Sequence, residues 1–289
     1  MLSSSSSLSK QPNNEEIYIS DLSTEKRNEL AGKVVVSIDP NKGDLIYAVN
    51  SADKTQLRYR YTNMQRRKEK QSPRYDRICR FLKTKTYIEG QNICEWEGAA
   101  SQFSKKTLDF AAFKIYVQHK NVLNWRLATF YQQYIFRKLQ LSAYIRTQIS
   151  EARMLNTFKE KFGTPEDVVI CMGDWGGKGH LKYHAPTVKG KGFRELFRKA
   201  GYEVFLVNEF RTSCRCSYCQ DEIGVCSTFR HCINPRPWKN NIILRHGLVR
   251  CDRCHRRWNR DVNAASNIWR IASSELLGQG RPHYLQRAA

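Results

Sequence analysis

Residues 249–268 read VRCDRCHRRWNRDVNAASNI, and this stretch decides how the rest of the chain is interpreted. A Cys-x-x-Cys pair is followed seven residues later by Asp261, which opens a helix with an apolar face. Asp261, Ala265 and Ile268 follow an i, i+4, i+7 spacing that places the carboxylate on the same face as small and apolar side chains. A helix N-cap is the ordinary role of an aspartate at this position, but an acid on a buried face favours a further one.

The Cys-x-x-Cys pair of this stretch has a partner earlier in the chain. CRCSYC supplies Cys216 and Cys219, and CDRC supplies Cys251 and Cys254. Two such knuckles bite a tetrahedral Zn²⁺ with four thiolates, so we expect one zinc ion with no open position for water, which makes it structural. Further candidate ligands in the same region are left out of the set, because a stray Cys or His is usually packing or surface: Cys214, Cys226, Cys232, His231 and His255.

The composition points to a polyanionic partner. The 289 residues include 49 Lys and Arg against 27 Asp and Glu, a formal net charge of +22 that is spread along the chain. This favours nucleic acid first and a membrane surface second, with a merely soluble basic protein as the alternative. No apolar run of about 18 residues and no secretory signal are present, so we expect no membrane span and an intracellular protein whose cysteines stay reduced.

The pattern of apolar residues and turns predicts a mixed α/β sheet. Residues 1–30 are polar and Ser-rich and are expected to be a disordered leader. Strands are expected at 33–39, 44–50 and 56–61, then at 168–172 and 203–208, with a helix before the last. A long helical insertion is expected over about 64–162, because residues 99–162 contain no Gly or Pro. The predicted order is three strands, then helices, a strand, a helix and a further strand. This is the order of elements in the RNase H-like fold.

Many aromatic residues lie in the predicted helical insertion. Such a stripe is typical of core packing, although aromatic rings also stack on bases. The residues are Phe110, Phe113, Tyr116, Trp125, Phe130, Tyr131, Tyr134 and Phe136. We expect them to pack in the core.

Three carboxylates stand where elements begin or end. Asp39 ends the first strand, Glu209 follows the strand at 203–208, and Asp261 opens the last helix. Converging carboxylates suit Mg²⁺ or Mn²⁺, and two such ions activate a water and stabilise a departing 3′ oxygen. Taken singly, each acid also has an ordinary interpretation: Asp39 as a turn former before a proline, and Glu209 as a surface residue.

The segments VVVSIDPNKGDLIYAV, NEFRTSCRCSYC and CDRCHRRWNRDVNAASNI, in this order, resemble the nuclease half of the transposon-encoded TnpB family and of its eukaryotic relatives, the Fanzor proteins. The miniature type V CRISPR effectors share these features. The resemblance implies a RuvC-like domain of RNase H-like fold with catalytic Asp39, Glu209 and Asp261, and a zinc ribbon held by Cys216, Cys219, Cys251 and Cys254.

The second catalytic motif departs from the bacterial pattern. There the strand equivalent to VVICMGDW ends in a catalytic Glu, whereas this sequence has Gly173 at that place, beside Asp174. Fanzor proteins resemble this sequence in carrying the Glu on the strand before the ribbon, where Glu209 stands. We therefore prefer Glu209, and Asp174 is the weaker substitute.

The resemblance implies a Mg²⁺-dependent DNA endonuclease that uses a guide RNA, and a nuclear location if the source is eukaryotic. The expected organisation is a leader at 1–30, a RuvC-like domain at 31–210 and 259–275, a target nucleic-acid-binding zinc ribbon at 211–258 and a flexible tail at 276–289. We expect no counterpart of the family's large N-terminal lobe within these residues. Two alternatives stay open: a truncated transposon product that binds nucleic acid without cutting, and a zinc-ribbon scaffold that binds proteins.

Overall fold

A computed structural model describes residues 16–41, 43–53, 55–174, 190–234, 238 and 241–287. The chain divides into two compact units, one formed by Met1–Thr62 with Leu155–Ala289 and the other by Asn63–Met154. We describe each unit by itself. None of the described helices is both long enough and apolar enough to cross a membrane.

The first unit contains a five-stranded mixed sheet with the order β3-β2-β1-β6-β7. Its strands are β1 (Val34–Asp39), β2 (Asp44–Val49), β3 (Arg58–Thr62), β6 (Val168–Gly173) and β7 (Glu203–Val207). Strands β1, β2 and β3 pair antiparallel, whereas β1, β6 and β7 run parallel. The predicted antiparallel meander and the two later strands are thereby confirmed, and the class is mixed α/β as expected.

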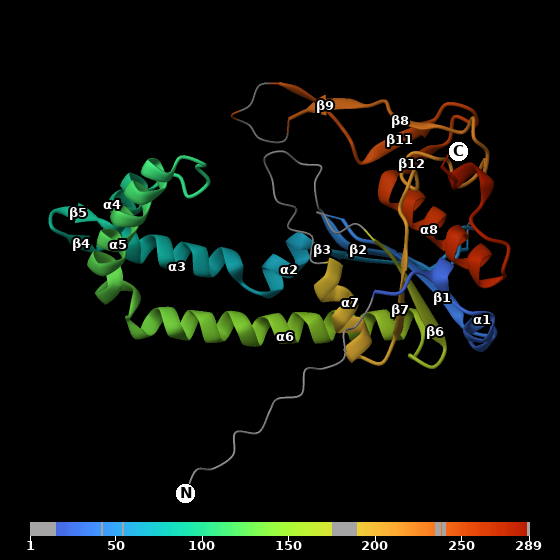
Figure 1. Ribbon diagram of the computed structural model, residues 1–289, viewed down its shortest axis with the longest axis horizontal. Coiled ribbons are helices and arrows are strands. Elements are labelled where there is room, and N and C mark those ends of the chain that lie inside the picture. Colours follow the sequence, from blue (N-terminus) through green and yellow to red (C-terminus); the bar gives the residue numbers. More distant parts are fainter. Residues whose placement is uncertain are drawn as a thin grey trace, which may run out of the picture. The chain divides into compact units, whose positions relative to one another are not determined.

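One face of this sheet is covered by α8 (Arg260–Leu276), which lies on the opposite side from α7 (Gly190–Lys199) (Figure 1). Because side chains alternate along a strand, Val169 and Cys171 of β6 face α8, where they pack with Ile268 and Ile271. The Ser37 hydroxyl on β1 donates to the Ala265 carbonyl at 2.7 Å, which fixes the helix against the strand.

Aromatic rings fill the other face. Phe158, from the last turns of α6 (Tyr134–Phe162), packs against Tyr59 of β3, Phe197 of α7 and Tyr202, with ring centroids 4.8 to 6.3 Å apart. Edge-on and tilted geometries dominate, as aromatic pairs prefer. Gly201, at φ +93°, makes the turn between α7 and β7.

Residues 16–30 form ordered elements that contribute three buried side chains to the core, so the expected disordered leader is wrong for this stretch; residues 1–15 lie outside the described residues. A 3-10 turn, η1 (Ile19–Asp21), precedes α1 (Thr24–Leu30). Ile19, Leu22 and Leu30 are each no more than 8% exposed within the apolar cluster on the α8 face. Few apolar residues suffice here because all three point into one cluster.

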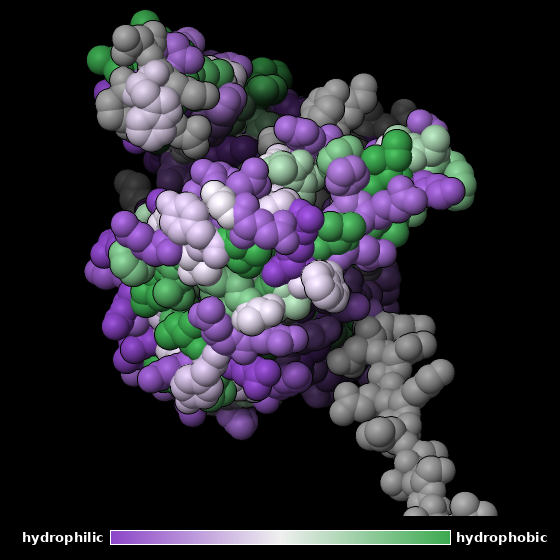
Figure 2. Space-filling model, turned by 90° about the vertical axis from the view of Figure 1, so that its left-hand side faces the viewer, coloured by the Kyte–Doolittle hydropathy of each residue, from purple (hydrophilic) through white to green (hydrophobic). Residues whose placement is uncertain are grey.

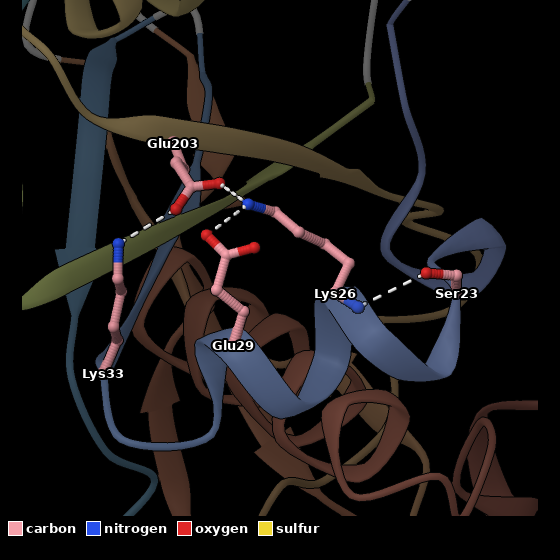
Figure 3. Close-up of polar contacts among 5 residues, drawn as sticks. All are labelled: Ser23, Lys26, Glu29, Lys33 and Glu203. Atoms are coloured by element: carbon pink, nitrogen blue, oxygen red, sulfur yellow. Dashed lines mark hydrogen bonds and ion pairs between the residues drawn. The ribbon is translucent and has the colours of Figure 1, made fainter.

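Ion pairs hold α1 to the edge of the sheet (Figure 3). The Glu203 carboxylate at the start of β7 accepts from Lys26 Nζ at 2.6 Å and from Lys33 Nζ at 2.9 Å. Lys26 also pairs with Glu29, and the Ser23 hydroxyl caps the helix by accepting from the Lys26 amide. These contacts are partly exposed, so the buried apolar residues stabilise the segment more than the charges do.

The predicted flexible tail is also wrong for the residues that the structure describes after α8. Tyr284 and Leu285 of the short turn η2 (His283–Leu285) are at most 5% exposed and join the same apolar cluster. The Tyr284 hydroxyl donates to Asn267 Oδ1 at 2.9 Å. The segment is therefore tied to α8 by burial and by a buried hydrogen bond.

The second unit is the predicted helical insertion. It contains α2 (Asn63–Glu69), α3 (Ser72–Lys85), β4 (Tyr87–Ile88), β5 (Gln91–Asn92), α4 (Ile93–Ala100), α5 (Phe110–Tyr131) and most of α6. Its core is small and centres on Ile93, Leu123, Leu127, Phe130 and Phe136.

Most of the aromatic stripe is not in that core, so the expectation that it packs there is wrong. Phe130 and Phe136 are buried, but Trp125 is 82% exposed, Phe110 79% and Tyr134 76%. Figure 2, in which the left-hand side of Figure 1 faces the viewer, shows hydrophobic residues among hydrophilic ones on this surface. The helices here are not amphipathic enough to hide every ring against so small a core.

Candidate active site and metal centre

The three predicted acids come together at one end of the sheet, on the α8 face. Asp39 is the last residue of β1, Glu209 follows β7 by two residues, and Asp261 lies in the first turn of α8. Parallel strands end at the same edge, and the alternation of side chains turns Asp39 and Glu209 to the same face. The topology therefore explains why acids far apart in sequence are neighbours.

Mutual repulsion identifies this cluster. Burial raises the pKa of Asp39 well above its usual range, and the charges of Glu209 and Asp261 raise it further, while Arg260 opposes them. Asp39 is only 8% exposed. Carboxylates that oppose one another's ionisation in this way form a site whose charge a cation would neutralise.

Asp261 is not the cap of its helix. The cap is Asn259, whose side-chain oxygen accepts from the amides of Asp261 and Val262 at 2.9 and 3.2 Å. The Asp261 carboxylate instead accepts from Asn41 Nδ2 at 2.6 Å. The ordinary interpretation of this aspartate is thereby excluded, and its carboxylate points into the acid cluster.

A fourth acid, Asp44, was missed by the sequence analysis. It is 5% exposed, pairs with Arg60 Nε at 2.7 Å and raises the pKa of Asp261, although burial is the larger cause. Its signal was present in the sequence: an acid at the start of β2 must lie beside the end of β1 in an antiparallel pair. The cluster therefore contains four carboxylates, one of them neutralised by an arginine.

Glu209 occupies the space over Gly173. A Cβ atom at position 173 would lie 1.6 Å from Glu209 Oε1 and 2.5 Å from its Cδ. The carboxylate from the end of β7 thus fills the place where a side chain from the end of β6 would begin. A side chain at 173 and the observed Glu209 position exclude each other.

Asp174 forms hydrogen bonds that support the backbone near Glu209. Its carboxylate accepts from the Glu209 backbone amide at 3.2 Å and from the Tyr18 hydroxyl at 3.2 Å. Its own amide donates to the Val207 carbonyl at 3.0 Å. Asp174 therefore holds the backbone that carries Glu209, which favours Glu209 as the acid that faces Asp39.

The four predicted cysteines come together as a candidate metal centre. The ligand atoms of Cys216, Cys219, Cys251 and Cys254 all lie within 4.8 Å of one another. Two of the sulfur pairs are 3.7 and 3.8 Å apart. A regular tetrahedron with Zn–S bonds of about 2.3 Å has edges of about 3.8 Å, so the donor set fits zinc in spacing and in chemistry.

Two neighbours favour the thiolate form of Cys216. A hydrogen bond from the Cys226 thiol is the main reason that the pKa of Cys216 is lowered to about 4, and the Trp258 indole also donates to its sulfur, at 3.4 Å. Cys226 is 6% exposed and packs beside the ligands. This excluded cysteine is a hydrogen-bonding neighbour of the centre, and outer partners of this kind orient metal ligands.

Two asparagines on α8 fasten the ribbon to the helix. Asn263 and Asn267 lie one turn apart, and each side-chain amide donates to the carbonyls of Thr212 and Arg215, at 2.6 to 3.3 Å. Asn263 Oδ1 also accepts from the Ser217 amide at 3.0 Å. Both asparagines are fully buried. The sequence signal was an i, i+4 pair of polar, weakly helix-forming residues on a buried face.

The ribbon lies directly beside the start of α8. Its strands are β8 (Cys226–Thr228), β9 (His231–Ile233), β10 (Ile242–Leu244), β11 (Leu248–Cys251) and β12 (Arg257–Asn259). Strand β12 leads straight into α8 (Figure 1). The second cysteine pair, β12 and Asp261 therefore follow one another directly along the chain.

A known family model matches this part of the chain. Residues 194–268 match the family model of the Cas12f1-like TNB domain. The TNB-like segment begins in α7 and ends in α8, so it contains Glu209, the four cysteines and Asp261. No curated protein sequence matches the chain.

Among the solved structures that are similar to the chain is a cryo-EM structure of CasPhi-2 (Cas12j) bound to crRNA and phosphorothioate-DNA, with 15% sequence identity and a TM-score of 0.46. The match covers 91% of this chain and 48% of that one, so the chain spans about half the length of CasPhi-2.

Removing the Asp39 charge is expected to stabilise the protein without divalent cations. Because its pKa is raised in the folded state, the folded protein holds a proton that the unfolded chain releases at about pH 4, and the free energy of unfolding falls as pH rises towards the folded pKa. Asp39→Asn escapes this loss. Thermal unfolding of the zinc-loaded protein should show a Tm advantage for the variant that is larger at about pH 7 than at about pH 4. An equal difference at both pH values would contradict the assignment.

Proposed function

We propose that this chain is the catalytic part of a TnpB/Fanzor-type nuclease, a RuvC-like domain of RNase H-like fold that hydrolyses DNA phosphodiesters with divalent cations and is directed by a guide RNA. The observation that carries the proposal is the meeting of Asp39, Glu209 and Asp261 at the ends of β1, β7 and the start of α8. A TNB-like match over residues 194–268 supports it independently.

The residues fit the proposed cations. Asp39, Glu209 and Asp261 would hold Mg²⁺ or Mn²⁺, because hard cations take carboxylate oxygens. When bound there, such ions supply an activated water and stabilise the leaving 3′ oxygen.

The protein contributes the placement of these acids. Asn41 orients the Asp261 carboxylate, and Asp174 holds the backbone of Glu209. Arg60 neutralises Asp44, which limits the excess negative charge beside Asp261. Burial and the neighbouring carboxylates raise the pKa of Asp39, and a bound cation would offset the repulsion among these acids.

The experiment compares cleavage of single-stranded and duplex DNA in Mg²⁺ or Mn²⁺ by the wild type, Asp39→Asn and Asp261→Asn. We expect each variant to lose at least about 100-fold in rate, equivalent to about 2.7 kcal/mol of transition-state stabilisation. Asp76→Asn, the same change at an exposed acid of the helical unit, is the matched control and should cut like the wild type.

Two outcomes would contradict the proposal. Cleavage that survives in both variants would remove the acids from the reaction. Salt-sensitive DNA binding without any cleavage by the wild type, with or without co-purified RNA, would instead favour the alternative of a nucleic-acid-binding protein that does not cut.

A further inference from the structure

A cavity of about 330 Å³ lies between the connection of β2 to β3 and the ribbon strand β12. Its walls include Arg58 from β3, Arg256 and Arg257 from the ribbon, and the Trp258 ring. All of these belong to the first unit of the chain. The size suits one nucleotide-sized group, and the walls combine positive charge with an aromatic surface.

The arginines of this cavity are left with unneutralised charge. None of the three forms an ion pair with a carboxylate among the residues that the structure describes, although Asp53 also lines the cavity. Asp53 accepts instead from the Ser51 hydroxyl at 3.2 Å. Planar guanidinium groups without a carboxylate are well suited to bind phosphate oxygens through two hydrogen bonds.

Aromatic rings hold two of these arginines in place. The Arg256 guanidinium lies 3.7 Å from the centroid of the Tyr218 ring and 5.4 Å from that of Trp258. Arg257 lies 5.7 Å from the centroid of Phe229. Such contacts orient a guanidinium while leaving its N–H groups free to meet a ligand. Less side-chain entropy is then lost when an anion binds.

The cavity adjoins the acid cluster through one turn of chain. Asn259 lines the cavity and caps α8, and its side chain accepts from the amide of Asp261 two residues later. Tyr47 of β2 lies near both places. Burial raises the pKa of its phenol, and the charges of Arg58 and Asp261 act on that pKa in opposite directions, Arg58 lowering it and Asp261 raising it. The cavity and Asp261 therefore both adjoin the first turn of α8.

We propose that this cavity is a subsite for a nucleotide of single-stranded nucleic acid, in which Arg58 and Arg257 bind backbone phosphate and Trp258 forms the apolar wall. The proposal rests on the proposed function, since the strand is the one whose scissile phosphate lies at Asp39, Glu209 and Asp261. The subsite is what keeps that strand extended along β3 and the ribbon.

The test measures binding rather than cleavage, so that it does not depend on activity. The probe is a fluorescent oligothymidylate of about 16 nucleotides, with an oligouridylate of equal length as the RNA arm. Both are titrated without Mg²⁺ onto the full chain carrying Asp39→Asn. Arg58→Gln and Arg257→Gln are compared with Arg250→Gln.

Arg250 is a matched control. It is the cross-strand partner of Arg257 and lies 5.8 Å from the same Phe229 ring, but it does not line the cavity. We expect Arg58→Gln and Arg257→Gln each to weaken binding about 5- to 10-fold and to lower the slope of log K against log salt by about 0.7. Arg250→Gln should change affinity less than about twofold.

Equal losses in Arg250→Gln and Arg257→Gln would overturn the subsite, because diffuse charge would then explain binding. Unchanged binding by Arg58→Gln and Arg257→Gln would overturn it as well. Specific loss in either the DNA or the RNA arm supports it and identifies the strand. If these losses appear but the wild type never cleaves DNA, the subsite stands and only the proposed nuclease function fails.

Discussion

Placing a methyl group at position 173 is expected to displace the Glu209 carboxylate and to abolish metal-dependent cleavage. The new Cβ would lie 1.6 Å from Glu209 Oε1, a separation that no pair of non-bonded atoms tolerates. The glutamate side chain is flexible and can rotate away, so the fold should survive with a small loss of stability. Gly173→Ala should therefore cut as slowly as Glu209→Gln, at least about 100-fold below the wild type.

A carboxylate swap sharpens this prediction. Glu209→Gly combined with Gly173→Glu moves the acid to the end of β6, into the space that Glu209 has vacated. We expect the pair to recover part of the cleavage that Glu209→Gly alone loses. Gly192→Ala is the matched control, since nothing lies within 4 Å of a Cβ there, and it should cut normally. Full cleavage by Gly173→Ala would show that the Glu209 carboxylate is not needed where the structure has it.

Loss of one zinc ligand is expected to unfold the ribbon. Cys219→Ser removes one of four thiolates from a site whose binding free energy is of the order of 10–16 kcal/mol in zinc-binding peptides. Without the ion, little holds a ribbon made of strands three to four residues long. Metal analysis should find about one zinc per wild-type chain and a loss in the variant. Limited proteolysis should then cleave the variant between residues 211 and 258.

The control for this experiment is Cys214→Ser. Cys214 lies in the same loop, and its sulfur contacts the Arg211 carbonyl instead of the metal cluster. We expect this variant to keep its zinc and its resistance to protease. Zinc retained at full stoichiometry by Cys219→Ser, or lost from Cys214→Ser, would contradict the ligand set.

Local patterns predicted the parts of the fold that they control. The β-branched run before Asp39 and the turn after it predicted the antiparallel β1 and β2, and the buried run at 168–172 predicted β6. The two Cys-x-x-Cys pairs predicted their own cluster, since ligand spacing is a local property. The acids at strand ends followed from the same logic, because strand direction decides which ends meet.

The errors all concern where an element packs. Residues 16–30 looked too polar to fold, yet Ile19, Leu22 and Leu30 find a cluster built by β6, β7 and α8. The aromatic residues of α5 looked like a core, yet Trp125 is exposed among the residues that the structure describes. Composition shows how apolar a segment is, but not whether a complementary surface exists elsewhere.

The missed residues also depend on distant contacts. Asp44 gains its place from the antiparallel pairing of β1 and β2. Asn263 and Asn267 gain theirs from carbonyls about 50 residues earlier in the chain. A helix position read alone shows only that an asparagine is a poor helix former, and its partner must be seen before its purpose is clear.

The position of Glu209 has a consequence for the whole molecule. Because Glu209 follows β7 and the end of β6 carries no acid at position 173, two of the three acids flank the zinc ribbon in sequence, one before its first cysteine pair and the other after its last. The ribbon thus connects Glu209 to Asp261 along the chain. Of the three acids, only Asp39 is not adjacent to the ribbon in sequence. Under the proposed function, a tilt of the ribbon on a bound strand would change the spacing between Glu209 and Asp261, so that strand binding and cleavage would be coupled.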